Sequence, residues 1–161
     1  WDEFFISDYS NAIKESEIDT DYLEIEFMEN ITISEERLKE CIRAFHNMGF
    51  SCSLDDFGNG FSNFSLLKES GLDTIKIDRC FFIEEMNDVN KGILKTIIFL
   101  IKRIGMKVIA EGVERKEDVE FLASIGCDAV QGFYFYKPMP MEEFFALLDE
   151  EKVCPFGHAQ R

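Results

Sequence analysis

The sequence has few of the residues that build disulfide-rich or zinc-binding domains. Its five cysteines are an odd number without a C-x-x-C pair, and His46 and His158 are its two histidines. Such spacing argues against a zinc site and against a disulfide framework. It favours reduced, mostly buried thiols and a cytoplasmic compartment. We expect both histidines in structural or surface positions.

Long hydrophobic runs are also absent, since no stretch reaches the roughly 18 apolar residues of a membrane span. A signal peptide is not supported, because no basic segment leads into an apolar stretch. We therefore expect a soluble chain. Basic residues are scarce: 17 Lys and Arg stand against 32 Asp and Glu, a formal net charge of −15. This balance argues against DNA binding, which needs clustered Lys and Arg.

Apolar residues make up 46% of the 161 residues and include 17 Phe, the composition of a folded domain with a sizeable core. The chain opens on Trp1 rather than Met, and we expect further sequence upstream. We predict one domain over residues 1–150 and a C-terminal tail over 151–161.

A unit of helix, glycine and short strand recurs along the chain. In four copies a polar or acidic residue follows the glycine after about one strand length. The pairs are Gly49 and Asp55, Gly71 and Asp78, Gly105 and Glu111, and Gly126 and Gln131. Glycine suits the left-handed conformation that ends a helix. The repeat therefore predicts helices that alternate with strands.

Hydrophobic periodicity locates these elements. Ser34 is predicted to cap a helix whose apolar side carries Leu38, Ile42 and Phe45. A later helix is predicted to bury one face, made of Ile93, Ile97, Leu100, Ile101 and Ile104. The predicted strands span residues 22–27, 51–56, 73–78, 107–111 and 128–132.

Alternating strands and helices predict an α/β fold with parallel strands and right-handed crossovers. A complete (β/α)₈ TIM barrel typically needs about 250 residues, so we predict an incomplete barrel of about five βα units. A doubly wound open sheet is the alternative from the pattern alone. Against it, no G-x-G-x-x-G or P-loop follows any predicted strand.

Charged and polar residues gather at the carboxyl ends of the predicted strands. They are Glu26, Asp55, Asp56, Lys76, Asp78, Glu111 and Gln131. In a TIM barrel these ends converge on one rim, which carries the active site. Converging carboxylates repel one another unless a cation neutralises them, and hard oxygen ligands suit Mg²⁺, Mn²⁺ or Ca²⁺. Each residue taken alone also fits a turn, a cap or a solvated surface.

Several segments resemble motifs of the EAL-domain phosphodiesterases. Residues 55–62, Asp-Asp-Phe-Gly-Asn-Gly-Phe-Ser, are similar to the DDFGxGxS loop of that family. The other segments are 26–29 (E-[IL]-T-E), 76–78 (KID), 111–114 (EGVE), 131–133 (QGY/F) and 137–140 (KPxP). The resemblance implies a TIM-barrel-type domain that hydrolyses the bacterial second messenger cyclic di-GMP to pGpG with one or two Mg²⁺ or Mn²⁺ ions.

The resemblance also implies the ligands of these ions. Glu26 and Asp55 would bind one metal, and Asp55 and Asp56 would serve the second. Glu111 would be a second-site ligand or the general base.

Further roles carry over from the same motifs. Lys76 would hold or activate the attacking water, and Gln131 would orient water or a ligand near the phosphate. Asp78 and Glu114 would support these residues.

A loop anchor is implied as well. Glu29 would anchor the loop 57–62, which couples metal binding to dimerisation in the family. The loop residues that match are Phe57, Gly58, Gly60 and Ser62. Met28 and Asn63 depart from the family's Thr and Ser, which bears on regulation more than on chemistry.

Two metal-binding motifs of the family, Glu-Ala-Leu and Asn-x-Ser, do not occur in this sequence. The resemblance places them in strands that precede Trp1, so we expect a C-terminal piece of the domain that is inactive when isolated. It further implies cyclic di-GMP as ligand, a homodimer, and upstream sensor, diguanylate-cyclase or membrane-anchoring segments. The alternatives are a degenerate EAL domain that acts as a cyclic di-GMP receptor or docking module, and an unrelated metal-dependent barrel enzyme.

Overall fold

The computed structural model describes residues 5–16, 18–30, 33–59, 64–82 and 86–149. Its five strands form one sheet in which every neighbouring pair is parallel and the spatial order follows the chain. The strands are β1 (Glu24–Met28), β2 (Ser51–Phe57), β3 (Thr74–Ile77), β4 (Lys107–Ala110) and β5 (Ala129–Val130). The predicted α/β fold is confirmed. The sequential strand order differs from a doubly wound sheet, whose order reverses at a switch point.

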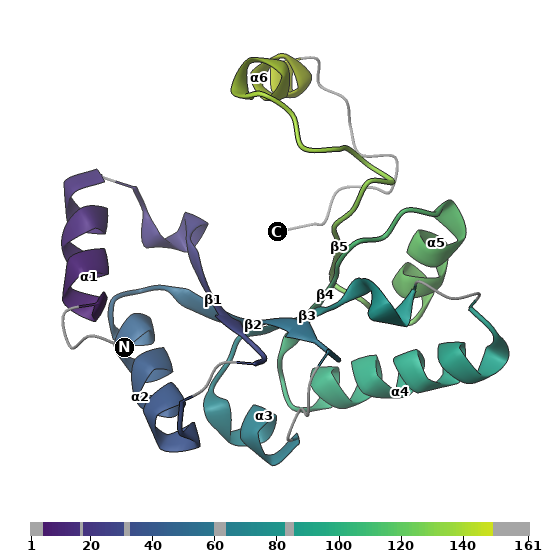
Figure 1. The fold of residues 1–161 in the computed structure, drawn as a ribbon, viewed down its shortest axis with the longest axis horizontal. Helices are drawn as coiled ribbons and strands as arrows, with labels where there is room; N and C mark the ends of the chain where they lie inside the picture. Colours follow the sequence, from purple (N-terminus) through teal and green to yellow (C-terminus); the bar gives the residue numbers. More distant parts are fainter. Residues whose placement is uncertain (1–4, 17, 31–32, 60–63, 83–85, 150–161) are drawn as a thin grey trace.

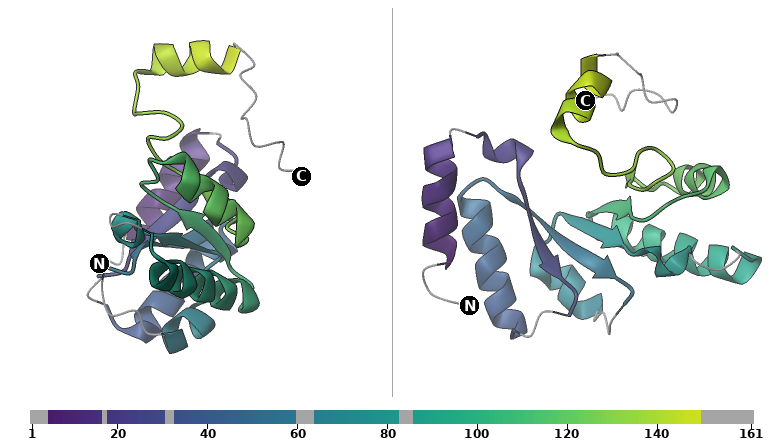
Figure 2. Two further views of the ribbon diagram at one scale, coloured as in Figure 1. Left: turned by 90° about the vertical axis from the view of Figure 1, so that its right-hand side faces the viewer. Right: turned by 45° about the horizontal axis from the view of Figure 1, so that its top comes forward.

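Six α-helices surround or extend this sheet in the described part of the chain. They are α1 (Phe5–Ser16), α2 (Glu35–Asn47), α3 (Phe64–Ser70), α4 (Asp88–Arg103), α5 (Lys116–Ser124) and α6 (Met141–Asp149), with 3₁₀ turns η1 (Thr20–Tyr22) and η2 (Arg79–Phe81). The sheet is curved, with α2, α3 and α4 along its outer side, and α6 stands apart from it (Figures 1 and 2). Within the described ranges, none of these helices has the length and hydrophobicity that a membrane span requires.

The predicted helix after Ser34 is confirmed as α2. The Ser34 hydroxyl accepts a hydrogen bond from the Arg37 N–H, which satisfies one free donor of the first turn. Its predicted apolar side is buried against β2, and Phe45 makes edge-to-face ring contacts with Phe27 and Phe50. Burial of this one apolar face therefore holds α2 against the sheet.

The predicted inner face of α4 is wrong in part. Ile93 and Leu100 are exposed, whereas Leu94, Ile98 and Ile101 are fully buried. Half of the 16 residues of α4 are apolar, so periodicity alone selects a set of residues that is shifted by one position from the set packed on β4. The buried set keeps the same i, i+4, i+7 spacing.

The glycine of each repeat has the conformation that the pattern requires. The φ angles are 92° at Gly49, 81° at Gly71, 90° at Gly105 and 87° at Gly126. The chain turns back at each of these glycines, so the next strand lies beside the previous one and parallel to it. Strands β3, β4 and β5 are shorter than predicted, so Asp78, Glu111 and Gln131 come directly after the strands rather than within them.

Candidate active site

Lys76 is the centre of a charged cluster on the central strand β3. Its ammonium nitrogen lies 2.7 Å from Glu26 Oε1, 3.3 Å from Asp55 Oδ1 and 2.8 Å from Glu111 Oε1. The three carboxylates come from β1, β2 and the end of β4, so parallel pairing brings residues 50 positions apart into contact. The Lys76 side chain is only 8% exposed. These four residues of the predicted rim therefore meet in one place.

The cluster changes the protonation of its members. Burial opposes the charged form of Lys76, but hydrogen bonds to Glu111 and Glu26 outweigh it and raise the pKa of the ammonium above its ordinary value. Lys76 therefore stays positively charged near neutral pH. Burial also raises the pKa of the Glu111 carboxyl; Lys76 opposes that shift and the negative charge of Asp55 adds to it.

Asp56 lies beside this cluster in an unusual backbone conformation. Its φ angle is 59°, which few non-glycine residues adopt, and its N–H donates to Asp55 Oδ1 at 3.0 Å. The pairing of β2 with β3 shifts register between Leu54 and Phe57, so both aspartates lie in a bulge. Burial, then the charges of Asp55 and Asp78, raises the pKa of the Asp56 carboxyl.

Asp78 does not contact Lys76. It caps the η2 turn instead, because its Oδ1 accepts the Cys80 N–H at 2.8 Å. Burial would raise the pKa of the Asp78 carboxyl, but hydrogen bonds from Cys80, Asn59 and Arg79 lower it overall. The supporting role that the resemblance implies for Asp78 stays a prediction.

The predicted loop anchor is partly described by the structure. Glu29 Oε2 accepts the N–H of Gly58 at 3.0 Å, and Phe57 is buried in β2. Gly58 has a φ of 111°, and a Cβ there would lie 2.2 Å from the Phe81 ring. Glycine is thus required where β2 leaves the sheet. The other two predicted loop residues, Gly60 and Ser62, lie outside the described residues.

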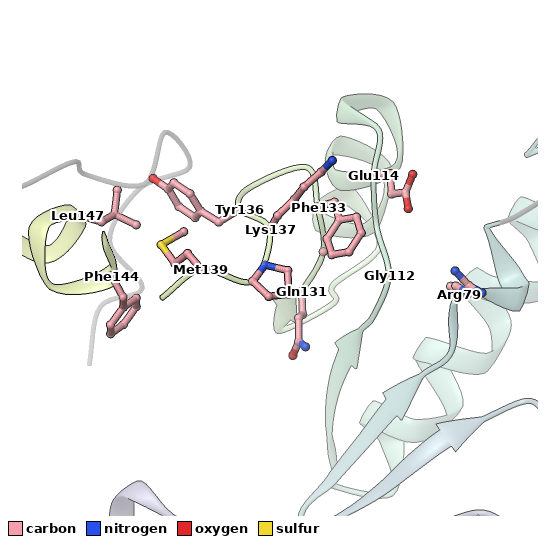
Figure 3. A pocket seen from close by; sticks show the side chains of 12 residues that line it. Arg79, Gly112, Glu114, Gln131, Phe133, Tyr136, Lys137, Met139, Phe144 and Leu147 are labelled. Atoms are coloured by element: carbon pink, nitrogen blue, oxygen red, sulfur yellow. The ribbon is translucent and has the colours of Figure 1, made fainter. Parts of the chain in front are cut away.

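Gln131 and Glu114 line a cavity of about 470 Å³. Figure 3 shows the side chains of its wall. The Gln131 N–H donates to the Ala110 carbonyl at 2.8 Å, which holds its backbone beside the end of β4. The walls also carry basic and apolar side chains, which include Arg79, Phe133, Tyr136, Lys137 and Met139. Sequence reasoning gave no role to Arg79, although it directly follows a strand-end acid, nor to Lys137, although it begins the KPxP segment.

The residues of the cluster suit a divalent cation. Three carboxylates from separate strands already surround one positive group, the Lys76 ammonium, and Asp56 directly follows one of these acids along β2. Hard oxygen donors of this kind are the ligands that Mg²⁺ and Mn²⁺ prefer. Such a cation would add positive charge to a site with more carboxylates than ammonium groups, so the donor set fits the predicted metals.

Comparison with known proteins connects this geometry to a family. The family model described as EAL domain matches residues 1–138. The chain belongs to the EAL domain family. The predicted domain boundary at residue 150 lies beyond that match and stays a prediction.

Several known proteins have sequences related to this chain. The chain is 40% identical over 100 residues to the bifunctional diguanylate cyclase/cyclic di-GMP phosphodiesterase MucR of Pseudomonas aeruginosa, over 62% of this chain and 15% of that protein. It is 34% identical over 124 residues to the cyclic di-GMP phosphodiesterase PdeR of Escherichia coli, over 76% of this chain and 19% of that protein. The EAL chain thus spans less than a fifth of either relative.

Solved structures share its fold. The EAL domain of Mycobacterium smegmatis DcpA superposes with a TM-score of 0.86 at 32% identity, covering 94% of this chain and 69% of that one. The manganese/cyclic di-GMP complex of Klebsiella pneumoniae BlrP1 superposes with a TM-score of 0.74 at 27% identity, covering 83% of this chain and 34% of that one. EAL domains are TIM-barrel-type folds, and the five strands described here form an incomplete barrel.

Proposed function

We propose that the protein carrying this EAL chain hydrolyses cyclic di-GMP to pGpG with Mg²⁺ or Mn²⁺ as cofactor. The observation that carries the proposal is the contact of Lys76 with three carboxylates from three strands. Relatives named as cyclic di-GMP phosphodiesterases, and a related structure solved with manganese and cyclic di-GMP, support it.

The strand-end acids would hold the cation. Glu26 and Asp55 would bind one ion, and Asp55 and Asp56 would serve a second. The bulge at Asp55 and Asp56 supports this sharing, because it lets two consecutive residues of one strand present carboxylates near the same place. The cation, when bound, supplies Lewis-acid polarisation of the phosphodiester and activation of water.

The neighbouring residues would position the reactants. Lys76 is a charged donor rather than a base, since hydrogen bonds raise the pKa of its ammonium. It can hold a water molecule or offset the negative charge that develops on phosphate. Glu111 is better suited to accept a proton, because burial raises the pKa of its carboxyl toward neutrality. Gln131 would orient water or substrate from the cavity wall.

The cavity offers complementary chemistry for a cyclic dinucleotide. Phe133 and Tyr136 present aromatic faces on which a purine base can stack, and Arg79 and Lys137 offer positive charge to phosphate. Gly112, which follows Glu111 in the chain, also lines the cavity, so a nucleotide seated there would extend its phosphate toward the proposed ions.

The alternative is a cyclic di-GMP receptor or docking module without hydrolysis. It is less well supported, because Glu26, Asp55, Asp56 and Glu111 are all present and at least three of them converge. A product assay separates the two functions. The complete protein is incubated with cyclic di-GMP and Mn²⁺, and the nucleotides are resolved by chromatography. The enzyme predicts pGpG that disappears with a chelator and in Asp55→Asn, whereas the receptor predicts bound but unchanged cyclic di-GMP.

A further inference from the structure

We propose that His46, Cys52 and Asp73 form a second metal site, for a thiophilic divalent cation such as Zn²⁺, at the amino end of the sheet. His46 lies in the last turn of α2, Cys52 is the second residue of β2, and Asp73 directly precedes β3. Lys76 is three residues further along β3, so the two sites are about 10 Å apart along the strand and on opposite ends.

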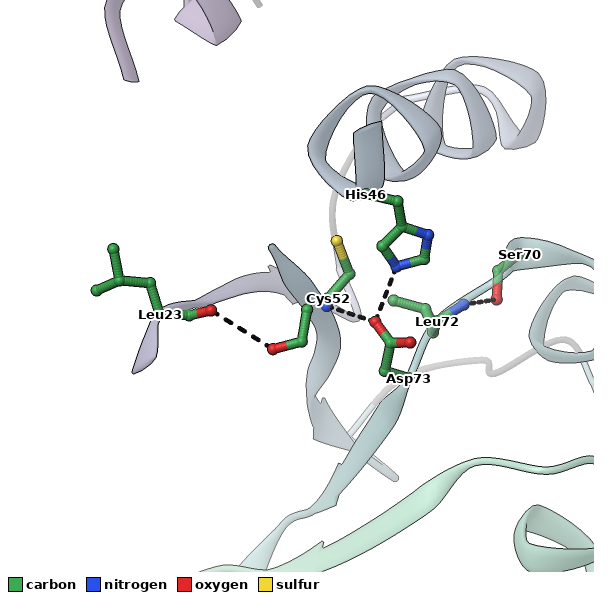
Figure 4. Close-up of polar contacts among 7 residues, drawn as sticks. Leu23, His46, Cys52, Ser70, Leu72 and Asp73 are labelled. Carbon is green, nitrogen blue, oxygen red and sulfur yellow. Dashed lines mark hydrogen bonds and ion pairs between the residues drawn. The ribbon is translucent and has the colours of Figure 1, made fainter. Parts of the chain in front are cut away.

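The three side chains present one ligand atom each at close range. The imidazole, thiol and carboxylate atoms all lie within 4.8 Å of one another. His46 Nε2 is 2.8 Å from Asp73 Oδ2, and the same oxygen accepts the Cys52 N–H at 2.7 Å (Figure 4). Tetrahedral Zn²⁺, with bonds of 2.0–2.3 Å, separates its ligand atoms by about 3.4–3.6 Å, so coordination requires changes of only about 1 Å.

The same arrangement of an aspartate before one strand, a strand N–H and a helix end occurs a second time in the structure. This second copy shows which residues the structural contacts need by themselves. Asp128, which directly precedes β5, accepts the Val108 N–H at 2.8 Å and pairs with Lys102 at the end of α4. There the helix-end group is an ammonium and the strand residue is valine, neither of which binds metal. The equivalent place in the first copy holds an imidazole and a thiol. The hydrogen bond from the strand N–H and the ion pair to the helix end explain the aspartate and its cationic partner. They do not require a cysteine at position 52.

The chemistry of the set selects the metal. A thiolate with an imidazole and one carboxylate favours Zn²⁺, Co²⁺ or Cd²⁺ over Mg²⁺ and Mn²⁺, which prefer oxygen. Three protein ligands leave the fourth position to water. The side chains of His46 and Asp73 are 34% and 43% exposed, which gives an ion access, while Cys52 is fully buried below them. An ion here would connect α2, β2 and β3.

Proton release accompanies binding at this site. Burial, followed by the charges of Asp73 and Glu24, raises the pKa of the Cys52 thiol to about 12. The metal must therefore displace the thiol proton, and affinity is expected to increase with pH. C-x-x-C spacing does not detect such a site, because the three ligands are far apart in the sequence. Cys52 and Asp73, for example, are separated by 21 positions.

The test is a Co²⁺ titration of the complete, metal-stripped protein, followed by absorption spectroscopy. Sulfur-to-cobalt charge transfer gives a near-ultraviolet band that oxygen ligation does not produce. We expect this band in the wild type and its loss in Cys52→Ser, while Zn²⁺ added afterwards displaces it. His46→Gln, at a partly exposed position, should weaken Co²⁺ binding at least tenfold and provides a second readout if Cys52→Ser does not fold.

Matched controls exclude two of the three other described thiols. Cys80→Ser, next to Asp78 at the carboxyl end of the sheet, and Cys41→Ser, inside α2, should both retain the band. Zn²⁺ should raise the thermal midpoint of the wild type and of these controls but not of His46→Gln. A wild type without the band, or a band that persists unchanged in Cys52→Ser and His46→Gln, would overturn the proposal. Neither outcome bears on hydrolysis at the Lys76 cluster.

Discussion

The Lys76 ammonium and the Glu111 carboxylate lie 2.8 Å apart and join the centre of β3 to the end of β4. Both side chains are largely buried, and each shifts the protonation of the other. The pair holds a permanent positive charge beside a carboxylate with a raised pKa. This combination, next to further strand-end acids, underlies the predictions on activity and stability.

Replacement of Lys76 by alanine is expected to destabilise the EAL domain and to slow hydrolysis. Glu26, Asp55 and Glu111 would lose their shared partner and repel one another, at a cost of about 3 kcal/mol for a broken buried pair. The rate constant kcat should fall by about 10²- to 10⁴-fold, with cyclic di-GMP binding largely retained. Denaturant unfolding and steady-state kinetics measure both effects. Lys95→Ala, on the exposed side of α4, is the control that should change neither.

Glu111→Gln tests the pH dependence of the reaction. The pKa of Glu111 is raised, so a falling pH protonates it while an ordinary glutamate is still ionised, and its ability to accept a proton is lost. The acid limb of kcat should therefore lie above the usual glutamate range. In Glu111→Gln we expect a kcat lower by about 10²- to 10⁴-fold without this limb. An unchanged acid limb in the variant would assign the titration to another group.

Much of this site could be predicted from the sequence because the signal is local. Glycine, a short strand and a terminal polar residue recur at intervals of about one strand length, so the sequence alone aligns the strand ends near Asp55, Lys76 and Glu111. The contacts across 50 residues followed from parallel pairing alone.

Other features depend on packing that no local pattern records. The predicted inner face of α4 is shifted by one residue, because half of that helix is apolar and more than one face fits the pattern. The His46, Cys52 and Asp73 cluster joins three elements, and the left-handed conformation of Asp56 has no glycine to mark it. Arg79 reaches the cavity wall because the η2 turn follows β3 directly.

Cys80 is expected to react slowly with alkylating agents although it is exposed. Burial of part of its thiol, and then the hydrogen bond and charge of Asp78, raises its pKa to about 11, so about one thiol in a thousand is ionised at pH 8. Peptide mapping after iodoacetamide treatment should show faster modification of Cys80 in unfolded protein and in Asp78→Asn. Equal rates in folded and unfolded protein would contradict the raised pKa.

Two glycine-to-alanine substitutions should have opposite effects on stability. A Cβ at Gly132 would lie 2.0 Å from the Val113 carbonyl oxygen, so the backbone beside Gln131 must move. We expect a loss of about 1–3 kcal/mol in unfolding free energy. A Cβ at Gly92, inside α4, meets no atom within 4 Å, and Gly92→Ala should gain about 0.5–1 kcal/mol from helix propensity. Thermal denaturation of both variants measures the difference.

The position of bound Mn²⁺ tests the central claim most directly. Crystals of the complete protein with cyclic di-GMP and Mn²⁺, measured at a wavelength where manganese scatters anomalously, locate the ion without reference to activity. We predict an anomalous peak in contact with Asp55 and with Glu26 or Asp56, adjacent to Lys76. A manganese ion bound elsewhere, with these carboxylates free of metal and the nucleotide in place, would contradict it.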